Sequence, residues 1–125
     1  MTIPNKRPVF FHLLQLQLPV TALVSIAHRV SGILLFLALP ALIWLLDRSL
    51  SAADGFAVVA HLLDGWPLRL AALVLLWALA HHLLAGLRLL LIDAEIGVER
   101  QAARRTAWAV GIGALLALAA GVLWL

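Results

Sequence analysis

Three long apolar segments follow one another along the 125-residue chain, and short polar stretches separate them. The segments run over about residues 20–46, 68–93 and 106–125. Each is long enough to cross a bilayer as a helix, which takes about 20 residues. The pattern therefore predicts an all-α integral membrane protein with three transmembrane helices.

The polar stretches predict the remaining organisation. Residues 1–18 are mixed in character and are expected to lie in the cytoplasm or at the membrane interface. Residues 47–67 predict a connection that contains a short interfacial helix at about 56–63, and residues 94–105 predict a charged loop. Pro40 is expected to kink the first helix.

Composition supports the membrane assignment. Hydrophobic residues make up 65% of the chain and charged residues 12%, whereas a soluble domain is closer to half and a quarter. We therefore treat residues 1–125 as a single membrane-anchor domain. The absence of cysteine excludes disulfides and cysteine-ligated clusters within this chain. The net charge of +3 is thinly spread, which favours lipid headgroups over nucleic acid as the partner.

Basic residues orient the helices. One side of the predicted bundle carries Lys6, Arg7, Arg29, Arg88, Arg100, Arg104 and Arg105, and the other carries Arg48 and Arg69. The positive-inside rule then places the N-terminus in the cytoplasm. Three helices alone make a poor self-sufficient bundle, so we expect them to pack with helices of a membrane partner.

A polar stripe lies near the start of the first helix. Its members Ser25, His28, Arg29 and Gly32 are spaced i, i+3, i+4 and i+7, which is one helical face. A hydroxyl, an imidazole and a cation there could bind a polar headgroup or an anionic propionate. Alternatively, Arg29 extends to lipid phosphate and Ser25 bonds to its own helix backbone.

His82 lies deep in the second apolar segment, roughly 16 Å from the cytoplasmic end if the helix ends at Asp93. Its neighbours on one face are Ala78, Ala85, Gly86 and Leu89. Because three of them are small, we interpret this face as a shallow slot for a flat macrocycle whose iron His82 ligates. The alternative is a neutral histidine that is hydrogen-bonded to a neighbouring helix.

Other polar residues of this segment predict structural roles. His81 points about 100° away from His82 and is expected to pack or to form a hydrogen bond. Arg88 and Asp93 lie nearer the interface, where a local salt bridge or extension to the headgroups is the default expectation. Trp77 is expected to pack.

Together these motifs resemble the cytochrome b subunit of bacterial succinate dehydrogenase, the larger of the two membrane anchors of respiratory complex II. The resemblance covers nearly the whole chain, including its length and its three spans. It is carried by Arg7-Pro8, Leu18-Pro19-Val20-Thr21-Ala22, Ser25-x-x-His28-Arg29-x-Ser31-Gly32, His82-x-x-x-Gly86-x-Arg88 and Asp93.

The resemblance implies a role for each matching residue. His82 corresponds to the axial ligand of one haem b, whose second ligand comes from the smaller anchor subunit. Ser25 and Arg29 correspond to residues of the ubiquinone site. His28 corresponds to a residue near the haem propionates, with Arg29 as a second contact. Many family members carry a histidine where this chain has Leu89, which leaves the propionates to His28, Arg29 or the partner.

The resemblance also implies the function. This subunit performs no dehydrogenation itself but belongs to succinate dehydrogenase, an enzyme of the tricarboxylic acid cycle and of electron transport. Electrons pass through a flavoprotein subunit and an iron–sulfur subunit to ubiquinone at the bacterial inner membrane. Two alternatives are a haem-free structural anchor and a small ion-conducting membrane protein, since intramembrane His and Arg also mark ion pathways.

Overall fold

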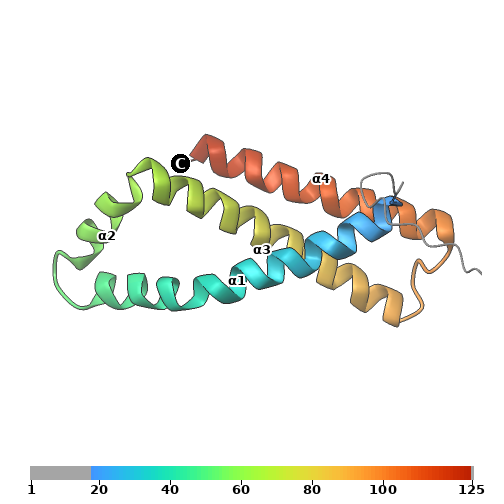
Figure 1. Cartoon of the computed structure of the whole chain (residues 1–125), viewed down its shortest axis with the longest axis horizontal. Helices are drawn as coiled ribbons and strands as arrows, with labels where there is room; N and C mark the ends of the chain where they lie inside the picture. Colours follow the sequence, from blue (N-terminus) through green and yellow to red (C-terminus); the bar gives the residue numbers. More distant parts are fainter. Residues whose placement is uncertain (1–17, 125) are drawn as a thin grey trace, which may run out of the picture.

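The computed structural model describes residues 18–124, which form four helices. These are α1 (Val20–Leu50), α2 (Gly55–Leu63), α3 (Trp66–Asp93) and α4 (Arg100–Trp124), and the described residues form no strand (Figure 1). Helices α1, α3 and α4 are long and apolar enough to cross a membrane. The prediction of an all-helical protein with three membrane spans is confirmed, whereas the expected interfacial segment lies, except for Leu18, outside the described residues.

The three long helices run up, down and up again. In Figure 1, α1 crosses α3, and α4 returns alongside α3. The start of α1 and the α3–α4 connection lie at one end, while α2 and the end of α4 lie at the other. The start of α1 and the second connection therefore lie at the same end of the described helices, which is the arrangement that the charge argument assumes.

Helix α1 begins directly after Pro19, whose own backbone is extended. The carbonyl of Pro19 accepts hydrogen bonds from the backbone N–H groups of Ala22 and Leu23, at 2.9 and 3.2 Å. The helix continues through Pro40 without a break and ends at Leu50, beyond the expected boundary. Its axis bends along its length (Figure 1), as is usual for a helix that contains a proline and so lacks one backbone hydrogen bond.

The other boundaries differ slightly from expectation. Helix α2 agrees with the short helix predicted at about residues 56–63. Helix α3 begins at Trp66, with Pro67 in its first turn, where a missing N–H does no harm. Helix α4 begins at Arg100, so the predicted charged loop over residues 94–105 is too long. Arginine, glutamine and alanine are strong helix formers, and they continue α4 beyond its apolar part.

The turn after α3 depends on one residue in the left-handed conformation. Glu95 has φ 61°, which few residues other than glycine adopt. This conformation lets Ile96 N–H donate to Leu91 O at 2.8 Å and Glu95 N–H donate to Ile92 O at 2.9 Å. The pair of bonds forms a Schellman motif, which satisfies carbonyls at the end of the helix and reverses the chain toward α4.

Helices α3 and α4 pack through small residues. Buried positions of α4 at heptad-like spacing are Ala107, Val110, Ala114 and Gly121. A Cβ atom on Gly121 would overlap the side chain of Leu76 from α3, so glycine allows close approach there. Small residues at such interfaces are typical of membrane helices, where packing replaces the hydrophobic effect.

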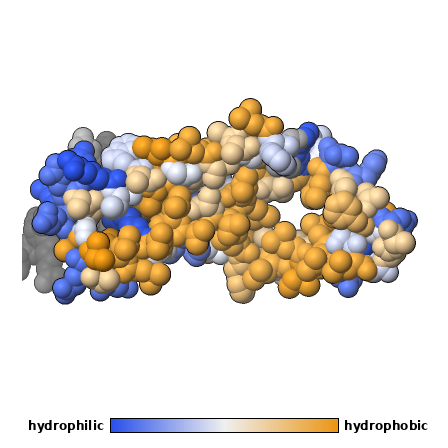
Figure 2. Space-filling view, turned by 180° about the vertical axis from the view of Figure 1, so that it is seen from behind, coloured by the Kyte–Doolittle hydropathy of each residue, from blue (hydrophilic) through white to orange (hydrophobic). Residues whose placement is uncertain are grey.

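The outer surface is predominantly apolar. Figure 2 shows hydrophobic residues over the middle of the molecule and hydrophilic residues gathered at its two ends. Only 6% of the apolar window of α1 is buried within the chain. An exposed apolar surface of this extent is suited to contact with lipid or with other membrane helices.

Candidate functional site

The central polar site lies where α1 crosses α3, and His82 is at its centre. Gly32 of α1 faces this imidazole directly. A Cβ atom on Gly32 would lie 2.9 Å from Cε1 of His82, which is closer than real Cβ contacts. The absence of a side chain at Gly32 therefore makes room for the ring against the backbone of α1.

One nitrogen of His82 is held by α1. Its Nδ1 lies 3.1 Å from the backbone carbonyl oxygen of His28 and 3.3 Å from Oγ of Ser31. The Ser31 hydroxyl is fully buried and donates to the same carbonyl at 2.9 Å. A carbonyl oxygen can only accept, so Nδ1 carries the hydrogen and Nε2 carries the lone pair. The contacts with α1 thus fix both the orientation and the tautomer of His82.

The ring of His28 lies beside this imidazole. The two rings are stacked, with centroids 4.2 Å apart and planes 20° from parallel. In addition, Nε2 of His28 would lie 3.8 Å from a Cβ atom on Gly86. The structure therefore brings together two predicted site residues, His28 and His82.

His81, although adjacent in sequence, has a different environment. It is only 4% exposed, and its Nε2 lies 3.4 Å from the carbonyl oxygen of Val24. Its ring also stacks on Trp77, with centroids 5.5 Å apart. These contacts agree with the predicted packing and hydrogen-bonding roles of His81 and Trp77.

The predicted slot of small residues beside His82 is wrong in part. Ala78 and Ala85 are 0% and 2% exposed, because helix packing covers them. Ala85 belongs to a buried cluster with Val24 of α1 and Val110 of α4. A flat ligand at His82 therefore has to approach from another side of the ring.

The polar stripe of α1 divides between two directions. His28 and Gly32 face α3, whereas Ser25 and Arg29 are exposed. The structure does not bring these two residues into the contacts around His82. They lie on an outer surface of α1, where a ligand in the membrane or a partner subunit could reach them.

The default expectation for Arg88, a salt bridge or contact with headgroups, is wrong. Its Nε donates to Oγ1 of Thr106 at 3.1 Å, and its terminal nitrogen donates to the carbonyl of Ala103 at 3.2 Å. Both acceptors belong to α4. Arg88 thus links the end of α3 to the start of α4. Asp93 is exposed.

The donor arrangement suits a single axial metal ligand. Among residues 18–124 there is no group of three or more His, Cys, Asp or Glu side chains that could enclose an ion. Histidines that bind metals usually donate their other ring N–H to a carbonyl or carboxylate, as Nδ1 of His82 does. The orientation of His82 therefore fits a single protein ligand to a haem iron.

The sequence did not predict that Ser31 and Gly32 contact the imidazole of His82. The predicted polar stripe of α1 included Gly32 without a contact and did not include Ser31. The signal was their spacing, since Ser31 follows His28 by three positions and so lies over the same carbonyl.

Comparison with known proteins gives consistent matches. Residues 4–121 match the family described as succinate dehydrogenase/fumarate reductase transmembrane subunit. The succinate dehydrogenase cytochrome b556 subunit of Coxiella burnetii is 34% identical over 96% of this chain and 97% of its own length. The subunit of the same name from Paracoccus denitrificans is 32% identical, over 90% of this chain and 86% of its own.

Proposed function

Because this chain belongs to the family of succinate dehydrogenase/fumarate reductase transmembrane subunits, we propose that it anchors a succinate dehydrogenase in the membrane and binds haem b through Nε2 of His82. The name cytochrome b556 in its relatives supports a b-type haem. The observation that carries the proposal is the hydrogen bond between Nδ1 of His82 and the His28 carbonyl, which leaves Nε2 free for iron.

The residues around His82 hold and orient the ligand. When bound, haem b supplies a reversible one-electron carrier. The carbonyl of His28 and the hydroxyl of Ser31 keep the imidazole in the tautomer that presents Nε2. A histidine of the smaller anchor subunit would hold the iron together with His82. Because Leu89 offers no polar group, His28, Arg29 or the partner subunit would hold the propionates.

Ubiquinone is reduced on the exposed side of α1. Ser25 donates a hydrogen bond to a quinone carbonyl, and Arg29 stabilises the negative charge that develops on the quinone oxygens during reduction. Both side chains are exposed in this chain and lie in the first three turns of α1. A fixed cation acts strongly at this depth, because the low dielectric of the membrane weakens screening.

The remaining subunits complete the electron path. A flavoprotein subunit oxidises succinate, and an iron–sulfur subunit delivers the electrons to the quinone at the cytoplasmic face of the bacterial inner membrane. This chain performs no dehydrogenation. It provides three membrane-spanning helices, with the N-terminus in the cytoplasm, against which the smaller anchor packs.

His82→Leu tests the haem assignment. In the membrane complex, this variant should lose most of the reduced-minus-oxidised b-type absorbance, because it removes the ring nitrogen that is proposed to bind the iron. His61→Leu is the matched control, since His61 is exposed on α2, away from the crossing. An unchanged spectrum in His82→Leu would refute the proposal.

Ser25→Ala and Arg29→Leu test the quinone assignment. Both variants should lower succinate-dependent quinone reduction at least tenfold, while reduction of a soluble dye stays within about twofold, because loss of one charge-stabilising contact costs about 2–4 kcal/mol. Arg48→Leu, an exposed arginine at the other end of α1, is the control. Equal losses with both acceptors would instead indicate defective assembly.

A further inference from the structure

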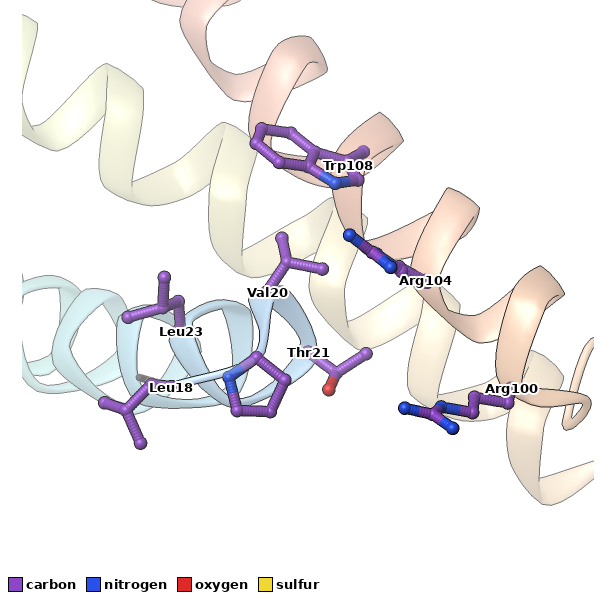
Figure 3. A pocket seen from close by; sticks show the side chains of 8 residues that line it. Leu18, Val20, Thr21, Leu23, Arg100, Arg104 and Trp108 are labelled. Atoms are coloured by element: carbon purple, nitrogen blue, oxygen red, sulfur yellow. The ribbon is translucent and has the colours of Figure 1, made fainter. Parts of the chain in front are cut away.

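A cavity of about 470 Å³ lies between the first turns of α1 and α4, away from the contacts of His82. Side chains from both helices line it (Figure 3). They are Leu18, Pro19, Val20, Thr21 and Leu23 from the start of α1 and Arg100, Arg104 and Trp108 from α4. The three α4 residues are four positions apart and so share one helical face.

The charge of this cavity is unbalanced. Arg100 and Arg104 are the charged members of its described lining, and no aspartate or glutamate accompanies them there. Two arginines at i and i+4 repel each other, so an anion between them removes an unfavourable interaction. The guanidinium fork also matches the oxygens of a phosphate better than an ammonium does. The cavity is therefore suited to a phosphate-bearing ligand.

The walls of the cavity indicate that the ligand is amphipathic. Figure 3 shows Arg100 and Arg104 reaching toward the start of α1, with the rings and branched chains of the other lining residues around them. Leu18 and Leu23 are 44% and 52% exposed, and Trp108 is 56% exposed. Tryptophan is enriched where hydrocarbon meets headgroups. The cationic part of the cavity thus adjoins apolar surface at the level of the membrane boundary.

We infer that this cavity binds an anionic phospholipid, with its phosphate on Arg100 and Arg104 and an acyl chain along Leu18 and Leu23. The bound lipid fills the space between α1 and α4 and links the starts of these helices. The charge of the site selects lipids with a net negative headgroup over zwitterionic ones, because the described lining holds no acidic group that would pair with a choline or ethanolamine.

Delipidated membrane complex in neutral detergent provides the test. Phosphatidylglycerol should bind saturably, as native mass spectrometry can measure, and should raise the thermal unfolding temperature, whereas phosphatidylcholine should do neither. Arg100→Gln with Arg104→Gln should weaken phosphatidylglycerol binding on the order of tenfold or more, since two basic contacts near the surface are lost. Arg48→Gln with Arg69→Gln, two exposed arginines outside the cavity lining, should leave it unchanged.

Three outcomes would overturn the inference. One is equal phosphatidylglycerol binding in the Arg100/Arg104 variant. Another is equal stabilisation by inorganic phosphate alone, which would show an anion site without a lipid. The third is loss of a soluble subunit from the variant with lipid binding retained, which would assign the arginines to a protein contact. If the double variant does not assemble, Arg104→Gln alone is compared with Arg48→Gln by the same measurements.

Discussion

Helix α3 makes two interfaces, and they bury different kinds of side chain. Toward α1, it buries His81 and covers Ser31, the two buried polar residues of the described chain, and it places His82 against Ser31. Toward α4, the buried positions are small and apolar, and the polar link through Arg88 lies near the end of α3.

The difference separates support from function. The α3–α4 interface depends on close packing, since alanine and glycine let the two helices approach closely. No side chain in its small apolar part has to hold one fixed orientation. The α1–α3 crossing instead fixes the direction of an imidazole, and it satisfies one ring nitrogen while leaving the other unused. An imidazole with one ring nitrogen held and the other available inside a membrane protein supports the proposed binding site.

The largest effect that would break this comparison comes from Gly32→Ala. Its new Cβ would lie 2.9 Å from Cε1 of His82, so the ring must move and haem content should fall several-fold. Gly111→Ala is a matched control, because a Cβ there meets nothing within 4 Å. Pyridine haemochrome assay of the purified complex measures both. Full haem content in Gly32→Ala would mean that the close approach does not matter for ligation.

A smaller effect is expected from Ser31→Ala. This variant keeps the carbonyl bond to His82 but removes the hydroxyl beside it, a change of about 1 kcal/mol or roughly fivefold in haem affinity. It should also shift the haem midpoint potential and its low-spin EPR signal. Ser49→Ala removes a similar bond to the helix backbone at an exposed position and should change neither. A potential and an EPR signal identical to wild type would exclude a positioning role for Ser31.

The smallest effect is expected at the α3–α4 interface, from Thr106→Val. Thr106→Val removes the acceptor of Arg88 Nε, and interhelical hydrogen bonds in membranes contribute about 0.6 kcal/mol on average. Thermal unfolding of the complex should therefore shift down slightly, with an unchanged haem spectrum. If the spectrum changed instead, the α3–α4 interface would belong to the functional site.

The sequence predicted the helices well, because membrane spans are determined by length and hydropathy alone. It also separated His82 from His81, since adjacent helical positions point about 100° apart and the structure gives the two rings different partners. Local spacing sufficed for both results.

What the sequence could not predict depends on contacts between helices. The spacing of Ala78 and Ala85 predicts a face of small residues, but it does not tell whether a ligand or another helix covers that face. In the structure, helix packing covers both residues. The partner of Arg88 lies 18 residues away in α4, beyond the reach of helical periodicity. Ser25 and Arg29 share a stripe with His28, but only the crossing angle of α1 decides which members of that stripe face α3.

The bond from His82 to the His28 carbonyl spans 54 positions of the chain, and it has a consequence for biogenesis. Neither segment alone contains the oriented ring, so the site exists only after the first and second spans have met within the bilayer. Under the proposed function, haem incorporation requires this encounter and also the ligand of the smaller anchor subunit. The b-type absorbance of the complex would therefore report both the packing of the two spans and the assembly of the two anchors.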